Sequence, residues 1–268
     1  MTLDHRDFTL DDLAQVKRSR RATVSVCIPA RNEATTLGTV LDGVVPLMKT
    51  RWPLVDELIV ANDHSQDDTV LIALARGAKV VHVDQCWFSR GPGKGTAMKA
   101  ALESTSGDLV VFLDADVHNF SANFVLGLVG PLLTEPNVKL VKPIYERDLN
   151  GIPGEGGRVT ELTAKPLIRN LFPDLSWVHQ PLAGECAGPA HVFSEIFQSA
   201  VVGGPWEGYG IEMEILIETS LRYGPGSISQ VYLGERRHRN RTLAELSVIA
   251  DQVAQVILSK TSLIQPGQ

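Results

Sequence analysis

The chain has little cysteine, and its three cysteines form no recognisable pattern. Cys27, Cys86 and Cys186 make neither a C-x-x-C pair nor an even set. Disulfide frameworks and structural zinc sites require such spacing, so we expect neither. No apolar run approaches the ~18–20 residues that cross a bilayer. The N-terminus is charged from Asp4 onward and lacks the apolar core of a signal peptide. We therefore expect a cytoplasmic protein without a membrane partner.

The chain also lacks an excess of positive charge. Its formal net charge is −6, whereas nucleic-acid binding depends on neutralising phosphates with Lys and Arg. We therefore expect no nucleic-acid partner. Two local basic clusters remain, residues 17–21 (KRSRR) and 236–241 (RRHRNR). We expect the first to be a solvated face or a flexible arm.

Two common glycine-rich nucleotide motifs are absent. Residues 91–96 (GPGKGT) superficially resemble a P-loop, but Phe88 stands where its first glycine belongs and Gly95 follows the lysine. The first expected strand is followed by Arg31, Asn32 and Glu33, so the glycine fingerprint of dinucleotide-binding proteins is missing. The GPGKGT loop remains a flexible backbone that could bring Lys94 to a phosphate, with Thr96 opening a helix. The alternative is a plain turn at the start of a helix.

What the 268 residues do contain is an alternation of strand-like and helix-like segments. Alternation of this kind implies βαβ units and the α/β class, with a doubly wound, mostly parallel sheet. The expected strands are residues 24–29, 55–61, 78–83, 109–113 and 138–145. The expected helices between them are residues 34–49, 67–76, 95–104 and 121–133.

Polar residues follow several of these strands. Ligands of open α/β sheets bind beyond the carboxyl ends of the strands, where residues 29–33 (PARNE), 62–65 (NDHS) and 114–116 (DAD) fall. Asp114 and Asp116 end the buried run GDLVVFLDADV, and residues two apart on a strand share a face. Two carboxylates there suit Mg²⁺ or Mn²⁺, which usually hold substrate phosphates. The alternative is an acidic turn without a metal.

The second half of the chain is organised differently. Glycine-rich loops lead to an expected helix at 158–172, a Gly/Pro-rich segment covers 181–205, and further helices are expected at 211–223 and 243–258, with a strand at 227–233. Gly157, Arg158 and Thr160 place backbone N–H groups, a guanidinium and a hydroxyl at a helix start, which suits an anion. The alternative is an ordinary capping loop. We expect one domain over 1–268, with a nucleotide half (22–118) and an acceptor half (119–260).

Ordered motifs give the chain a family resemblance. VSVCIPARNEATTLG, VDELIVANDHSQDDT, GPGKGTAMKAAL and GDLVVFLDADV, followed by GGRVTEL, KPLI, QPLAGE, EGYGIEMEILIE and RHRNR, occur in this order. The set resembles the GT-A glycosyltransferases and, among them, the glucosyl-3-phosphoglycerate synthase family. The resemblance covers residues 23–260 and implies a GT-A fold. It also implies retaining transfer of glucose from UDP-glucose to 3-phosphoglycerate, with Mg²⁺ or Mn²⁺ as cofactor.

The resemblance also implies roles for particular residues. Asp116 and His238 would bind the metal, and Asp116 and Glu212 would lie at the reacting centre. The donor would contact Pro29, Ala30, Arg31, Asn32, Glu33, Asp63, Lys94, Asp114, Ala115, Asp116 and Arg241. The acceptor would contact Gly157, Arg158, Thr160, Tyr209 and Asn240. Residues two apart on a helix face different directions, so only one of Glu212 and Glu214 should point into the site.

Several alternatives stay open. The donor could be GDP-mannose or another nucleotide sugar, and the acceptor another small molecule. A sugar nucleotidylyltransferase would normally carry a glycine-rich basic signature after the first strand, where PARNE stands. An inert binding protein could dispense with the metal acids, yet Lys94, Asp116 and His238 are present. Residues 188–193 differ from the expected basic stretch, and we expect them near the acceptor or at a dimer contact. We expect a homodimer.

Overall fold

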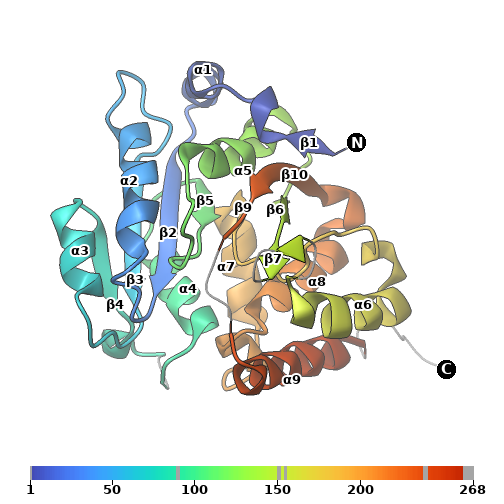
Figure 1. Cartoon of the computed structure of the whole chain (residues 1–268). Coiled ribbons are helices and arrows are strands. Elements are labelled where there is room, and N and C mark those ends of the chain that lie inside the picture. The colour runs from blue at the N-terminus through green and yellow to red at the C-terminus, as the bar shows by residue number, and fades with distance from the viewer. Residues whose placement is uncertain (1, 89–90, 150–151, 154–155, 238–240, 262–268) are drawn as a thin grey trace.

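The computed structural model describes residues 2–88, 91–149, 152–153, 156–237 and 241–261. Its centre is a sheet with the strand order β1-β10-β6-β9-β5-β2-β3-β4 (Figure 1). In that order the strands are Leu3–Asp4, Ile228–Glu235, Leu140–Glu146, Cys186–Pro189, Leu109–Phe112, Val24–Ala30, Glu57–Asn62 and Lys79–His82. A separate antiparallel pair joins β7 (Asp148–Leu149) to β8 (Ile152–Pro153).

Helices cover both faces of the sheet, as the expected doubly wound fold requires. One face carries α1 (Leu10–Arg20), α2 (Leu37–Met48), α3 (Thr69–Ala75) and α5 (Ala122–Thr134). The other carries α4 (Lys94–Glu103), α6 (Lys165–Leu171), α7 (Ala190–Ser199), α8 (Ile211–Tyr223) and α9 (Leu243–Lys260). Strand residues alternate between the two cores, since Val26 and Ile28 belong to the first and Cys27 to the second. The predicted α/β class is confirmed.

Short helical turns connect these elements. The 3₁₀ turns are η1 (His5–Asp7), η2 (Val83–Gln85), η4 (Pro173–Leu175), η5 (Pro205–Glu207) and η6 (Pro225–Ser227). The helix expected at 158–172 contains a π-helical segment, η3 (Thr160–Ala164), which continues into α6. Helix α4 begins at Lys94 with Gly93 as its cap, so Thr96 does not open it. Thr96 is buried within the helix instead.

One strand runs against the others. β9 pairs antiparallel with β5, where Cys186 lies opposite Phe112, and antiparallel with β6, where Ala187 lies opposite Val141. The remaining pairs of this sheet are parallel. Because β9 is reversed, the residues just before Cys186 lie at the same edge as the residues just after Phe112. The reversed strand therefore brings a further loop, residues 183–185, to the edge where ligands bind.

The Gly/Pro-rich segment contains regular structure that its sequence did not predict. It includes β9 and α7, and both Val192 and Phe193 are fully buried. Residues 188–193 therefore contribute to the core through Val192 and Phe193, whereas His191 is exposed, and their place near the acceptor or at a dimer contact stays a prediction. The strand was hard to recognise because its sequence, CAGP, lacks β-branched residues. Gly188 is required there, since a Cβ atom would lie 2.6 Å from the carbonyl oxygen of Lys139.

The basic cluster at residues 17–21 is only partly exposed to solvent. It forms the last turn of α1, and Arg21 ends the helix in a left-handed conformation (φ 55°). Lys17 is 5% exposed, forms an ion pair with Asp56 at 2.5 Å and donates to the carbonyl of Pro53. The expected solvated arm is therefore wrong for Lys17. Among the described residues, no helix combines the length and apolar character that crossing a membrane requires.

Candidate active site

A cavity of about 470 Å³ opens at the carboxyl edge of β2, β3 and β5. These strands are neighbours in the sheet, so the loops that follow them converge. Every residue predicted to bind the donor lines this larger cavity: Pro29, Ala30, Arg31, Asn32, Glu33, Asp63, Lys94, Asp114, Ala115, Asp116 and Arg241. The sequence did not indicate Gly208, Glu245, Val248 and Gln252, which helix α9 and the loop before α8 contribute.

The first two loops of this cavity are bound to each other. Asn32 accepts from the backbone N–H of Gln66 at 2.8 Å, and its own N–H donates to Ser65 Oγ at 3.0 Å. Asp63, 5% exposed, accepts from the N–H of Gly93 at 2.9 Å and pairs with the ring of His64. Asp63 therefore holds the glycine loop that precedes Lys94. Both Asn32 and His64 adopt left-handed backbone conformations.

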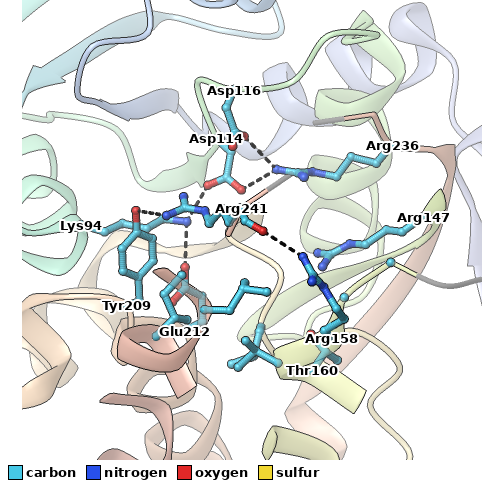
Figure 2. Close-up of a pocket in the computed structure, with 16 residues that line it drawn as sticks. Lys94, Asp114, Asp116, Arg147, Arg158, Thr160, Tyr209, Glu212, Arg236 and Arg241 are labelled. Atoms are coloured by element: carbon cyan, nitrogen blue, oxygen red, sulfur yellow. Dashed lines mark hydrogen bonds and ion pairs between the residues drawn. The ribbon is translucent and has the colours of Figure 1, made fainter. Parts of the chain in front are cut away.

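A second cavity of about 140 Å³ adjoins the first. It is lined by the predicted acceptor residues Gly157, Arg158, Thr160 and Tyr209, and by Glu212 (Figure 2). The two cavities share Lys94, Asp114, Asp116, Tyr209 and Arg241. They therefore meet at the predicted reacting centre. His238 and Asn240, predicted as metal ligand and acceptor contact, lie outside the described residues.

The two aspartates have different partners. Asp114 accepts from Lys94 Nζ at 2.6 Å through one oxygen and from Arg236 Nη2 at 2.7 Å through the other. Burial by itself would raise the pKa of Asp114, but Lys94 and Arg236 outweigh it and hold that pKa well below its usual range. Asp116 contacts Arg236 through one oxygen at 3.3 Å, and its other oxygen accepts no hydrogen bond from the described residues. Asp116 is thus the aspartate with an oxygen available to a ligand.

The donor set at Asp116 fits a magnesium or manganese ion. Such an ion takes oxygen ligands, commonly one or two carboxylates together with substrate phosphates. In the part of the chain that the structure describes, no group of three or more His, Cys, Asp and Glu side chains could hold a metal by itself. An ion bound by Asp116 would therefore depend on phosphate oxygens of a substrate for part of its coordination.

Lys94 joins Asp114 to Glu212. Its Nζ lies 2.7 Å from Glu212 Oε1, in addition to its contact with Asp114. Burial would lower the pKa of Lys94, but Asp114 and Glu212 raise it well above its ordinary value, so the amine stays protonated. Glu214 points away from the cavities and pairs with Lys260 at 2.5 Å. This confirms that only one of the two glutamates faces the site.

Three residues of a buried network beside the aspartates had no predicted role. Arg236, 2% exposed, donates through Nε to Glu185 at 2.6 Å. The hydroxyl of Tyr145 donates to the other oxygen of Glu185 at 3.1 Å and accepts from Arg147 Nη2 at 2.6 Å. Arg236 belongs to the RRHRNR motif and Glu185 to the QPLAGE motif. The sequence identifies both motifs but does not predict that these two residues pair with each other.

Three arginines of the smaller cavity have neutral partners within the described residues. Arg158 donates to the carbonyl of Arg241 at 2.9 Å, Arg241 donates to Tyr209 Oη at 2.7 Å, and Arg147 donates to Tyr145. Figure 2 shows Arg147 and Arg158 on one side of the cavity and Tyr209 and Lys94 on the other. Guanidinium groups bind phosphate and carboxylate through paired N–H groups. The cavity is therefore suited to a ligand with more than one negative charge.

The sequence of this chain is similar to known glycosyltransferases. Residues 25–170 match the model of glycosyl transferase family 2. Glucosyl-3-phosphoglycerate synthase of Mycolicibacterium paratuberculosis is 42% identical over 97% of this chain and 78% of that protein. The chain belongs to the glucosyl-3-phosphoglycerate synthase family. A more divergent synthase, from Petrotoga mobilis, is 35% identical over 94% of this chain and 77% of that protein.

Solved structures of the synthase family have the same fold. A crystal structure of the Mycobacterium tuberculosis synthase with Mn²⁺, UDP-glucose and phosphoglyceric acid has a TM-score of 0.84 and 41% identity. The match covers 97% of this chain and 86% of that chain. Another structure of that enzyme, with Mg²⁺ and UDP, also has a TM-score of 0.84 and 41% identity, covering 97% and 85%. The GT-A fold predicted for this chain is confirmed.

Proposed function

We propose that this protein transfers glucose from UDP-glucose to 3-phosphoglycerate, giving glucosyl-3-phosphoglycerate and UDP. The observation that carries the proposal is the meeting of two cavities at Lys94, Asp114 and Asp116. The larger cavity has room for the nucleotide sugar. The smaller one contains three guanidinium groups without acidic partners in the described part of the chain, which suit the phosphate and carboxylate of the acceptor. The relatives named above support both substrates.

Asp116 would hold Mg²⁺ or Mn²⁺ against the diphosphate of the donor. A bound divalent ion neutralises charge that develops on the departing diphosphate, a contribution of several kcal/mol. Arg241 lines both cavities and carries a charge that could stabilise the same group. Asp114, already bound by Lys94 and Arg236, would orient those two cations instead of binding the metal. His238 stays a predicted second ligand.

Arg158, with Gly157 and Thr160, would bind an anionic group of the acceptor at the start of the π-helical segment. Gly157 has a left-handed backbone (φ 78°) that a side chain would strain. Tyr209 would line the reacting centre from the opposite side, where its hydroxyl is fixed by Arg241. Asn240 stays a predicted acceptor contact.

We propose retention of the anomeric configuration, with an α-linked product. The support is electrostatic, because Lys94 binds both Glu212 and Asp114, and Arg236 binds both aspartates. Each of these acids therefore has a cationic partner, and none is a free general base. The departing phosphate oxygen would take the proton of the acceptor hydroxyl. Glu212 would orient Lys94 and the substrates. A β-linked product in proton NMR spectra would contradict this stereochemistry.

UDP release is the direct test of the proposed activity. UDP-glucose and GDP-mannose are each supplied with 3-phosphoglycerate, glycerate or a neutral sugar in the presence of Mn²⁺ or Mg²⁺. We expect nucleotide release with UDP-glucose and 3-phosphoglycerate. Release with GDP-mannose or with a neutral sugar alone would favour another donor or acceptor. Formation of diphosphate from a sugar phosphate and UTP would instead indicate a nucleotidylyltransferase.

We also propose one domain over residues 1–268, with its donor half at 22–118 and its acceptor half at 119–260. Each core contains residues from both halves: Cys27 packs in the same cluster as Ile257, and Val24 in the same cluster as Leu233. We propose a cytoplasmic location, because both substrates are highly charged metabolites that a cell retains. We also propose that the protein is a homodimer. Light scattering and cell fractionation test the two statements separately.

A further inference from the structure

Arg147 has an unused hydrogen-bond donor at the wall of the smaller cavity. Its Nε is buried and has no partner within the described part of the chain. Its guanidinium lies over the ring of Tyr145, 4.7 Å from the centroid, and its Nη1 lies 3.4 Å from where a Cβ on Gly157 would be. A buried donor without an acceptor is costly. Its place beside Gly157 and Arg158 suits an anionic group of the ligand.

A continuous chain of hydrogen bonds leads from Arg147 to the aspartates. Arg147 donates to Tyr145 Oη, which donates to Glu185, and Glu185 accepts from Arg236 through its other oxygen. Arg236 then donates to Asp114 and Asp116. Tyr145, Glu185 and Arg236 are 3%, 0% and 2% exposed, so water does not compete for these bonds. Glu185 accepts these two bonds through different oxygens, and Arg236 donates through Nε to Glu185 and through Nη2 to the aspartates.

We propose that Arg147 binds an anionic group of the acceptor through its guanidinium group, and that Tyr145 and Glu185 are positioning residues which link this contact to Arg236 and the two aspartates. The inference rests on the proposed function. It assigns a new acceptor contact to Arg147. It also makes acceptor binding and the binding of the donor with its metal ion interdependent.

The proposed coupling depends on the orientation of the Tyr145 hydroxyl group. Tyr145 Oη accepts one hydrogen bond and donates one, so fixing Arg147 fixes the direction in which the hydroxyl donates to Glu185. A fixed Glu185 orients Arg236, whose Nη2 sets the position of the Asp116 carboxylate. Coupling between two binding sites is reciprocal, so the acceptor should tighten donor binding by the same factor as the donor tightens acceptor binding.

Calorimetry with UDP and Mn²⁺ tests the coupling without turnover. In the unchanged protein we expect 3-phosphoglycerate to lower the Kd of UDP by about fivefold or more, within the usual range of such couplings. Tyr145→Phe keeps the ring and removes the hydroxyl. In this variant we expect 3-phosphoglycerate to leave the Kd of UDP almost unchanged. The matched control is Tyr232→Phe, because its hydroxyl bonds to Glu146 outside the buried chain. In this control, 3-phosphoglycerate should lower the Kd of UDP as much as in the unchanged protein.

Arg147→Gln provides a second, independent measurement on the cavity side. It should raise the Kd of 3-phosphoglycerate about tenfold or more, as expected for a lost charge-assisted contact, and leave the Kd of UDP alone almost unchanged. Unchanged coupling in Tyr145→Phe, or unchanged acceptor affinity in Arg147→Gln, would overturn the inference. If the unchanged protein binds UDP but not 3-phosphoglycerate, the proposed acceptor itself is wrong, a different failure from loss of coupling alone.

Discussion

Three acidic side chains near the point where the two cavities meet are each bound by a cation of the protein. Lys94 pairs with Asp114 and Glu212, and Arg236 pairs with Asp114 and Asp116. Pairing of this kind removes the repulsion that three neighbouring carboxylates would exert on a phosphate or carboxylate ligand. The arginines of the smaller cavity then determine the charge that the site prefers. At the scale of single residues, the charges of the site are therefore suited to anionic ligands.

Replacement of Arg158 tests this preference. In Arg158→Ala we expect the KM for 3-phosphoglycerate to rise roughly ten- to a hundredfold, because a charge-assisted contact contributes about 1.5–3 kcal/mol. The KM for UDP-glucose should change little, since Arg158 lines only the smaller cavity. Arg169→Ala is the control, an exposed arginine on α6. Equal changes in both KM values would contradict the assignment.

Gly184 lies directly against the ion pair between Lys94 and Asp114. A Cβ atom there would lie 2.2 Å from both Lys94 Nζ and Asp114 Oδ1, so any side chain must separate this ion pair. We expect Gly184→Ala to reduce kcat by at least about tenfold, because a displacement of about 1 Å at a reacting centre can cost a hundredfold. Steady-state kinetics measure the change. Gly226→Ala, where a Cβ would meet no atom within 4 Å, should behave like the unchanged protein.

At the scale of elements, helix α9 closes both cavities from one side. Leu246 and Ile249 line the smaller cavity, and Val248 and Gln252 line the larger one. Its last residue, Lys260, bonds to Glu214 at 2.5 Å and Glu218 at 2.7 Å on α8. The two glutamates are 3% and 6% exposed. This ion cluster therefore anchors the helix that shapes the site.

Removal of the cation should loosen that anchor. In Lys260→Met two buried carboxylates lose a partner, and we expect the free energy of unfolding to fall by roughly 2–3 kcal/mol, somewhat less than for a fully buried pair. Urea unfolding followed by circular dichroism measures the loss. Lys165→Met is the control, since Lys165 pairs with a partly exposed Glu161 and should cost less than about 1 kcal/mol. A similar loss in both variants would contradict a specific anchor.

The loss of unfolding free energy in Lys260→Met should also depend on pH. Burial raises the pKa of Glu218, but Lys260 and Arg222 lower it more, so its folded pKa lies below the ordinary value. Its ion pairs therefore stabilise the unchanged protein above the unfolded pKa, and this stability is lost as the pH falls through the folded pKa. Without Lys260, protonation of Glu214 and Glu218 removes the cost of burying carboxylate charges that have lost this partner. We expect the difference between the two proteins to shrink as the pH falls from 7 toward about 4.

At the scale of the whole molecule, the fold should not depend on the metal ion. Arg236 and Lys94 already balance the aspartates, and Glu185 holds Arg236 in place. We expect EDTA to abolish UDP release but to shift the Tm of the ligand-free protein by less than about 2 °C, unlike a structural metal site whose removal unfolds the domain. Added Mn²⁺ should restore turnover. Unfolding in EDTA, or full activity there, would contradict this prediction.

Local patterns in the sequence determined the fold class and part of the residues that line the cavities, whereas Tyr209, Glu212 and Arg241 were implied only by the family resemblance. Alternating apolar segments imply βαβ units, and parallel strands place their carboxyl ends at one edge. That rule predicts that Asp63, Asp114 and Asp116 lie together, and all three line the larger cavity. It also explains why the predicted donor residues share one cavity. The individual substrates were suggested by the resemblance of the ordered motifs, not by periodicity or composition.

Only the tertiary structure decided which charges pair with which. The reversed strand β9 places Glu185 at the carboxyl edge, where it meets Tyr145 and Arg236. These partners are 40 and 51 residues away in the sequence. Local propensity describes neighbours within a few residues, whereas the partner of a buried charge depends on strand order and direction. The physical reason is that burial makes such a charge unstable unless a partner is present, and packing alone determines which residue lies close enough.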